Sequence, residues 1–218
     1  MSIPLAYYDE PSFRTESAQR TCQLQAGNLS YSSMPTPPPV PNQEPAPTSE
    51  NNFTAHDVVQ ILRERNWHTS ELTAEQSTWC EHAATLLGPQ CADRAALESL
   101  LSLVFHYVAQ EILSHTDSHA ALSRYAARDA LRQLASLLLD PVPLNSDRLR
   151  EIIDIMKTNL DIRGRELFQT LRLSLAGRPG EGDLDRVILL LDEAAAANFA
   201  TPVKSARNRI IEFCCALD

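Results

Sequence analysis

The residues of this chain that are best suited to chemistry are its arginines. The 19 basic residues comprise 17 arginines and only two lysines, Lys157 and Lys204. Residues 141–218 carry 11 basic and 12 acidic residues, whereas residues 1–140 carry 8 basic and 16 acidic residues. Because a planar guanidinium binds phosphate through two parallel hydrogen bonds and stacks on unpaired bases, the second part of the chain is a candidate for contact with an anionic partner. The alternative is that these arginines are solvated partners of neighbouring acids.

Histidines and acids give no comparable pattern. His115 and His119 are four residues apart, as two metal ligands on one helix face would be, but a predicted helix cap at Asp117 lies between them. We expect ordinary surface or core histidines, no bound metal and no cofactor. The acidic run around Asp183 is expected to start a helix, with Asp183 as the N-cap.

No string typical of a catalytic or nucleotide-binding site occurs in the sequence: there is no P-loop, GxGxxG or GxSxG motif. The five cysteines form no CxxC pair and are typical of small buried side chains in a reducing compartment. A net charge of −9 argues against a protein that coats nucleic acid without selectivity. Neither a signal peptide nor a membrane-spanning run is recognised, so we expect a cytoplasmic protein that does not contact membranes. Because the catalytic motifs are missing, we also expect that it is not an enzyme.

Helices are the elements that would position the arginines. Thr54 with Asp57, and Thr73 with Gln76, are typical of capped helix starts, and Pro202 suits a first helical turn. Apolar residues repeat at helical spacing between such signals, and no stretch resembles a strand. The expected helices are eight, over residues 55–65, 74–87, 94–115, 118–139, 147–159, 164–177, 184–197 and 202–217. The predicted class is therefore all-α, a helical bundle.

Composition divides the chain into three parts. Residues 1–52 hold nine of the 14 prolines, and we predict a disordered Pro-rich tether with polyproline II character. Its PxxP-like spacing leaves open the docking of an SH3-type partner. Residues 53–140 and 141–218 are predicted to be two helical subdomains, either as two halves of one bundle or as two small bundles.

One stretch, Gly164–Gly177, reads GRELFQTLRLSLAG and has a recognisable pattern. The matching positions are Arg163-Gly164-Arg165, Leu167-Phe168, Leu171-Arg172, Leu175, Gly177, Gly182-Asp183-Leu184 and Val187-Ile188-Leu189-Leu190. This pattern resembles the helical anticodon-binding ("cage") region at the C-terminus of class I glutamyl-tRNA synthetases. Thr170 replaces the usual proline of that pattern, and Ala176 replaces its threonine.

The resemblance implies a module that binds tRNA or structured RNA, or an accessory to tRNA aminoacylation. The catalytic domain of the synthetase, with its HIGH-like and KMSKS-like motifs, has no counterpart here. Carried over by position, the RNA-binding residues would be Arg163, Arg165 and Arg172, with Arg178 in the loop that follows. The alternative is a helical protein–protein interaction module or regulatory adaptor that has lost RNA binding and captures a protein partner through its helical surface or the Pro-rich arm. A continuous arginine face would favour RNA, whereas dispersed and salt-bridged arginines would favour the adaptor.

Overall fold

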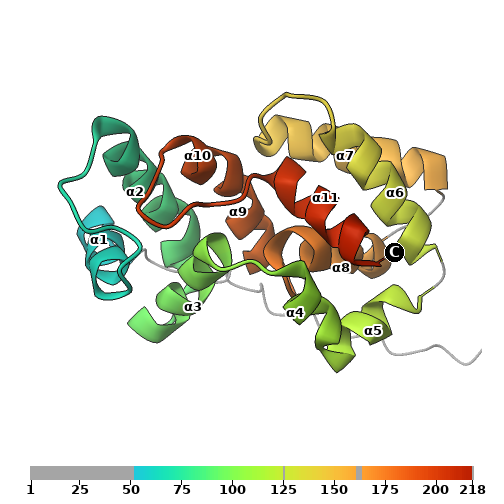
Figure 1. The fold of residues 1–218 in the computed structure, drawn as a ribbon, viewed down its shortest axis with the longest axis horizontal. Helices are drawn as coiled ribbons and strands as arrows, with labels where there is room; N and C mark the ends of the chain where they lie inside the picture. The colour runs from blue at the N-terminus through green and yellow to red at the C-terminus, as the bar shows by residue number, and fades with distance from the viewer. Residues whose placement is uncertain (1–51, 125, 161–163, 218) are drawn as a thin grey trace, which may run out of the picture. The chain divides into compact units, whose positions relative to one another are not determined.

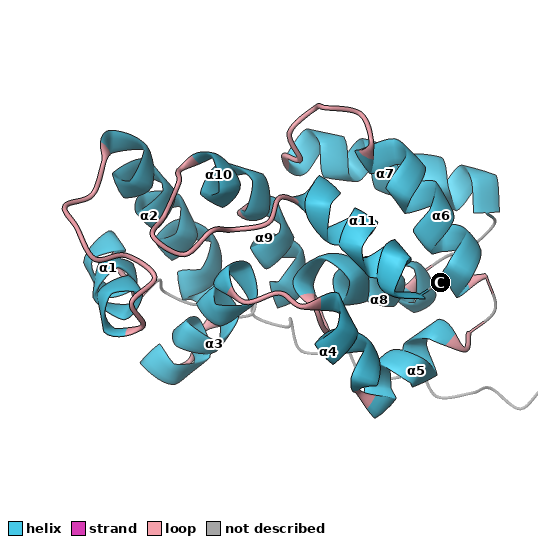
Figure 2. Ribbon diagram, in the orientation of Figure 1, coloured by secondary structure: helices cyan, strands magenta, loops and turns pink. Residues whose placement is uncertain are grey.

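The computed structural model describes residues 52–124, 126–160 and 164–217 of the chain. These residues form α-helices and one 3-10 turn, without any strand, which confirms the predicted all-α class (Figure 1, Figure 2). The helices are α1 (Ala55–Glu64), α2 (Ala74–Leu87), η1 (Gly88–Gln90), α3 (Arg94–Phe105), α4 (Ala109–Ser114), α5 (Thr116–Leu122), α6 (Ala127–Leu138), α7 (Ser146–Leu160), α8 (Arg165–Ala176), α9 (Asp183–Leu189), α10 (Leu191–Ala196) and α11 (Ala206–Leu217). The predicted Pro-rich tether lies outside the described residues, apart from residue 52. Within the described ranges, no helix combines the length and the apolar character that crossing a bilayer requires.

The first helices begin where the sequence signals place them. The Thr54 backbone N–H donates to the Asp57 carboxylate at 2.7 Å, and this hydrogen bond belongs to a capping box at the start of α1. The Thr73 backbone N–H donates to the Gln76 side-chain oxygen at 3.0 Å, and the Gln76 N–H donates to the Thr73 hydroxyl at 3.3 Å. At the end of α8, Gly177 adopts a left-handed conformation with φ 87°. These local rules therefore hold in the folded chain.

Three of the expected helices are divided, so the described residues form eleven α-helices where eight are expected. The helix expected over 94–115 breaks at His106 and Val108, whose φ/ψ pairs of −117°/110° and −133°/108° are extended. Tyr107 lies between them and is buried, with its hydroxyl donating to the Ser174 carbonyl. The Lys204 ammonium donates to the Tyr107 carbonyl at 2.9 Å. These long-range contacts replace the helical hydrogen bonds that a continuous helix would make.

The other differences have similar causes. Ala126 adopts a left-handed conformation with φ 61° and separates α5 from α6. Leu190, with φ −87° and ψ −10°, separates α9 from α10. Pro202 precedes the last helix and does not lie in its first turn, because α11 begins at Ala206, whose N–H donates to the Asp192 carboxylate at 2.8 Å. A carboxylate from another helix therefore sets this start, which a local pattern does not reveal.

One hydrophobic core joins residues from both predicted subdomains. Helix α6 packs against α8 and α11, and α4 also packs against α11 (Figure 1). The buried indole N–H of Trp79 donates to the Leu190 carbonyl at 3.1 Å. Around it, Phe105 and Phe199 contact the indole edge to face, with ring centroids 5.7 and 5.0 Å away. The two predicted subdomains thus share their core.

Arg209 of α11 is fully buried, and its side chain forms hydrogen bonds to three other segments of the chain. Its guanidinium donates to the carbonyls of Leu103 and Val104 in the last turn of α3, at 2.9 and 2.5 Å. It also donates to the Leu175 carbonyl in the last turn of α8 at 2.8 Å and to the Lys204 carbonyl at 3.1 Å. Carbonyls at the ends of α-helices lack partners within the helix and carry partial negative charge, so a buried cation is stabilised there.

Candidate functional site

The arginine at the centre of the predicted RNA-binding set, Arg172, is used inside the fold. Its Nε and one Nη donate to the two carboxylate oxygens of Asp185, each at 2.7 Å, and its other Nη donates to the Gly180 carbonyl at 2.7 Å. The guanidinium carbon lies 5.1 Å from the centre of the Phe168 ring. Only 12% of its side chain is exposed. Arg172 therefore joins α8 to α9 and to the turn between them. Arg163 lies outside the described residues.

Arg165 and Arg178 are exposed but lie at opposite ends of α8. Arg165 is the first residue of the helix, and Arg178 follows its C-terminal glycine. A helix of this length spans about 18 Å. Arg178 has a carboxylate oxygen of Asp183 at 3.9 Å, the limit of an ion pair. The three described arginines of the predicted set therefore do not form one continuous face.

Seven further basic side chains of the described residues are also paired with acids. These pairs are Arg65–Glu98, Arg94–Glu64, Arg132–Asp129, Arg148–Glu151, Arg150–Asp147, Lys157–Asp154 and Lys204–Glu212. Exposed pairs of this kind contribute at most about 1 kcal/mol each to stability. They do, however, neutralise the local positive potential that would attract a nucleic-acid backbone.

A hollow of about 270 Å³ lies between α5, the first turns of α8 and the turn that follows α8, and we call it the α5–α8 pocket. Four charged side chains line it: Asp117 and Arg124 from the α5 side, and Arg165 and Glu181 from the α8 side. No acid among the described residues lies within ion-pair distance of either arginine. Gln169, one turn after Arg165, also lines the pocket. The pocket therefore brings together residues separated by more than forty positions in the chain.

Charges of both signs line this pocket, which lies beside the end of α8. A Cβ at Gly177, just after α8, would lie 3.2 Å from the side chain of Ile112 in α4. The Ile112 carbonyl in turn accepts the hydroxyl of Ser118, in the first turn of α5, at 2.6 Å. The end of α8 is thus beside the end of α4 and the start of α5, and α5 packs against α8.

Gln169 is buried with 8% of its surface exposed, yet its side-chain oxygen has no donor among the described residues. An acceptor left without a donor in a protein interior costs about 1–3 kcal/mol. Two other buried side-chain atoms also lack a hydrogen-bond partner among the described residues, Nε2 of His68 and Oε1 of Gln133. Neither of these residues lines the α5–α8 pocket, whereas Gln169 does, with its side-chain oxygen buried.

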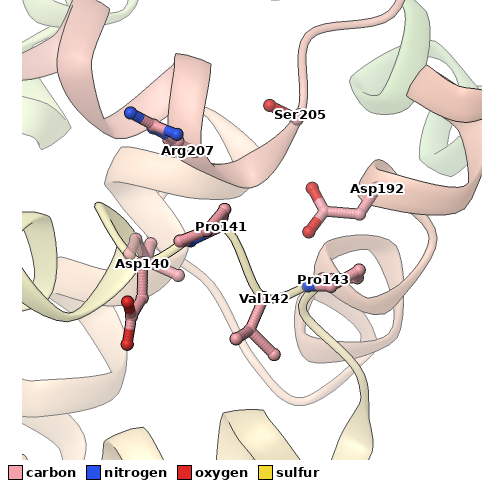
Figure 3. Close-up of a pocket in the computed structure, with 8 residues that line it drawn as sticks. Asp140, Pro141, Val142, Pro143, Asp192, Ser205 and Arg207 are labelled. Carbon is pink, nitrogen blue, oxygen red and sulfur yellow. The ribbon is translucent and has the colours of Figure 1, made fainter.

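A second hollow, also of about 270 Å³, opens between the α6–α7 connection and α11 (Figure 3). In this view Asp192 reaches from α10 toward the connection. Its carboxylate accepts the Leu144 N–H at 2.7 Å and the Ala206 N–H at 2.8 Å. Val142, on the rim, is 52% exposed. The half-buried acid of this hollow is already used to fix two segments, so the hollow offers no unpaired buried group of the described residues to a ligand.

The two buried cysteines are poorly suited to nucleophilic chemistry. Burial raises the pKa of the Cys80 thiol to about 12 and that of Cys91 to about 11, which makes both poor nucleophiles. His115 lies in the break between α4 and α5, and His119 lies within α5. Within the described ranges, no three His, Cys, Asp or Glu side chains come together as a metal site would require.

Arg124 and Gln169 are the pocket residues that the sequence analysis missed. The spacing of Asp117, Ala120, Ala121 and Arg124 is typical of one helix face, and Arg165 and Gln169 are four residues apart on α8. Both signals are present in the sequence. Their common location follows only from the packing of α5 on α8.

No protein-family model, curated protein or solved structure matches the chain. The resemblance to the glutamyl-tRNA synthetase cage region thus rests on the quoted motif alone.

Proposed function

We propose that the helical unit is a protein-binding module and that the α5–α8 pocket is its binding site. The observation that carries this proposal is the mixed charge of the pocket, which is lined by the two arginines Arg124 and Arg165 and by the two acids Asp117 and Glu181. The side chains of a polypeptide supply both signs of charge. A nucleic-acid backbone supplies negative charge only, which suits the arginines and is repelled by the acids.

The internal use of the arginines supports the same proposal. Arg172 donates to Asp185 and Gly180, and the other pairs described above are distributed over separate helices. Dispersed and neutralised arginines are what an adaptor would carry. The proposal includes no catalytic step.

Site-directed photo-crosslinking tests this function. A benzophenone amino acid in place of Ala120, an exposed residue of the pocket, should give protein adducts in an extract of the source cell. These adducts should resist ribonuclease and disappear in the Arg124→Glu/Arg165→Glu variant. The same amino acid at Thr158, exposed on α7, is the matched control. The proposal is refuted if ribonuclease removes the adducts, if the control position captures the same proteins, or if charge reversal has no effect.

Binding of tRNA or structured RNA is the second candidate, because one observation favours it. Arg124 and Arg165 both line the pocket without an acidic partner among the described residues, and unpaired guanidinium groups suit phosphate. In this case Arg124 takes the place that the sequence pattern gives to Arg172.

A further inference from the structure

We infer that the face around the α6–α7 connection binds a second copy of this chain, so that the protein forms a symmetric dimer. We call it the connection face, and it consists of residues 139–143 together with Arg207 and Ile211 of α11. The hollow at its centre shares no lining residue with the α5–α8 pocket. The inference therefore goes beyond the proposed function, and either can fail without the other.

Exposed apolar side chains gather at the connection face. Among the described residues, the large hydrophobic side chains that remain exposed are Leu139, Val142 and Ile211, at 50%, 52% and 38%. Leu139 and Val142 belong to the connection, and Val142 lines the same hollow as Arg207 (Figure 3). Ile211 follows Arg207 by four residues and so lies on the same side of α11. Apolar residues that gather in this way are typical of an interaction surface.

The charges of the connection face indicate what covers it. Asp140 and Arg207 both line the hollow, and the side chain of Asp140 is 67% exposed. The ion pair from Asp140 to Arg148 is long, at 3.6 Å, and Arg148 lies closer to Glu151, at 2.7 Å. Arg207 is exposed and has no acidic partner among the described residues. The face thus offers one acid and one base to a partner, which makes it complementary to a copy of itself.

A two-fold axis through this face would satisfy both charges at once. In an isologous dimer, every contact from one copy to the other is made twice. Arg207 of each copy would pair with Asp140 of the other, and Val142 would lose its exposure to water. A nucleic acid would pair with Arg207 alone and would be repelled by Asp140. Because few apolar residues take part, we expect a small interface and a dimer that dissociates in the micromolar range.

Sedimentation velocity of the full-length protein, up to about 200 µM, tests the dimer. We expect the sedimentation coefficient to rise with concentration toward that of a dimer. Val142→Ser removes apolar area from both copies and should weaken association about 10-fold. Asp140→Arg and Arg207→Asp each place two like-charged pairs in the interface, and each should weaken association at least about 10-fold. Arg63→Asp, at an exposed position of the distant helix α1, is the matched control and should have no effect (Figure 1).

A mixture of the two charge variants distinguishes pairing between copies from an effect within one chain. The two reversals change the net charge in opposite directions, so general repulsion cannot explain a loss in both. In a mixed dimer of Asp140→Arg with Arg207→Asp, both pairs between the copies again join opposite charges. Equimolar mixing should therefore restore association to about the wild-type affinity. Misfolding of either variant would not be repaired by mixing.

Three results would overturn the inference. They are a wild-type protein that stays monomeric at every concentration, a dimer that Val142→Ser and the charge reversals leave unchanged, or a mixture of the two reversals that associates no better than each alone. The second copy is also rejected as the partner if a photo-crosslinker at Val142 joins the wild-type chain to a different protein and never to itself.

Discussion

Replacing Arg209 by methionine should remove a large part of the stability of the helical unit. Methionine has a similar length and fills most of the space, but it cannot donate to the carbonyls of Leu103, Val104, Leu175 and Lys204. Four acceptors would lose their charged donor, and each buried acceptor without a partner costs about 1–3 kcal/mol. Removal of a buried charge recovers part of this sum, since the desolvation of the guanidinium disappears.

We therefore expect a net loss of about 3–5 kcal/mol, at the lower end of the sum for four acceptors because part of it is recovered. Burial lowers the pKa of Arg209 to about 10, so the guanidinium remains charged at neutral pH and the interaction with the two helix ends persists there. Because domains of this size are stable by about 5–15 kcal/mol, the variant should be marginal or partly unfolded at room temperature.

Urea unfolding of the wild type and the variant, followed by far-UV circular dichroism, measures this loss. Arg207→Met, an exposed position on the same helix, is the control and should change stability by less than about 0.5 kcal/mol. Arg209→Lys keeps the charge without the planar fork and should lie between the two. A loss below about 1 kcal/mol for Arg209→Met would refute the view that this side chain holds α3, α8 and α11 together.

Three further predictions concern other parts of the fold. Under native conditions Cys80 should react with a thiol reagent at least about 100-fold more slowly than the exposed Cys215, because burial raises the pKa of Cys80 to about 12. Mass spectrometry of the modified protein measures both reactions, and labelling of the two cysteines at the same rate would contradict the prediction. The backbone N–H and hydroxyl of Thr54 hold the pKa of Asp57 below its usual 3.8. The ionised carboxylate therefore stabilises the protein above pH 3.8, and this contribution is lost as the pH falls through the lower pKa of the folded state. Asp57→Asn should flatten the decrease of Tm on acidification, and an unchanged dependence of Tm on pH would contradict this prediction. Asp185→Asn should cost about 2 kcal/mol in urea unfolding, because it weakens a charge-assisted hydrogen-bonded pair that is largely buried, and a cost below about 0.5 kcal/mol would show that Arg172 is free to act elsewhere.

Much of the fold can be predicted from the sequence because its first signals are local. Capping residues and helical periodicity act within a few positions, which is why α1 and α2 begin where expected. The divisions at Tyr107, Ala126 and Leu190, and the start of α11 at Ala206, depend on contacts between distant segments. A single sequence does not display such contacts.

The candidate site shows the same limit more strongly. The motif around Arg172 is visible in the sequence, but whether its guanidinium faces a ligand or a carboxylate depends on the position of Asp185 after the turn. Arg124 and Arg165 become neighbours only through the packing of α5 on α8. That the side-chain oxygen of Gln169 is buried without a donor among the described residues follows only from the folded structure. Spacing reveals a face of one helix, whereas a site is formed between helices.

The choice between protein and RNA as the partner is tested most directly by titrating the full-length protein with total tRNA over a range of salt concentrations. We predict no saturable binding at micromolar protein in physiological salt, because Arg172 is paired with Asp185 and two of the four charged residues that line the pocket are acidic. Tight, salt-dependent binding would contradict it if Arg124→Ala/Arg165→Ala abolished that binding and Arg150→Ala did not.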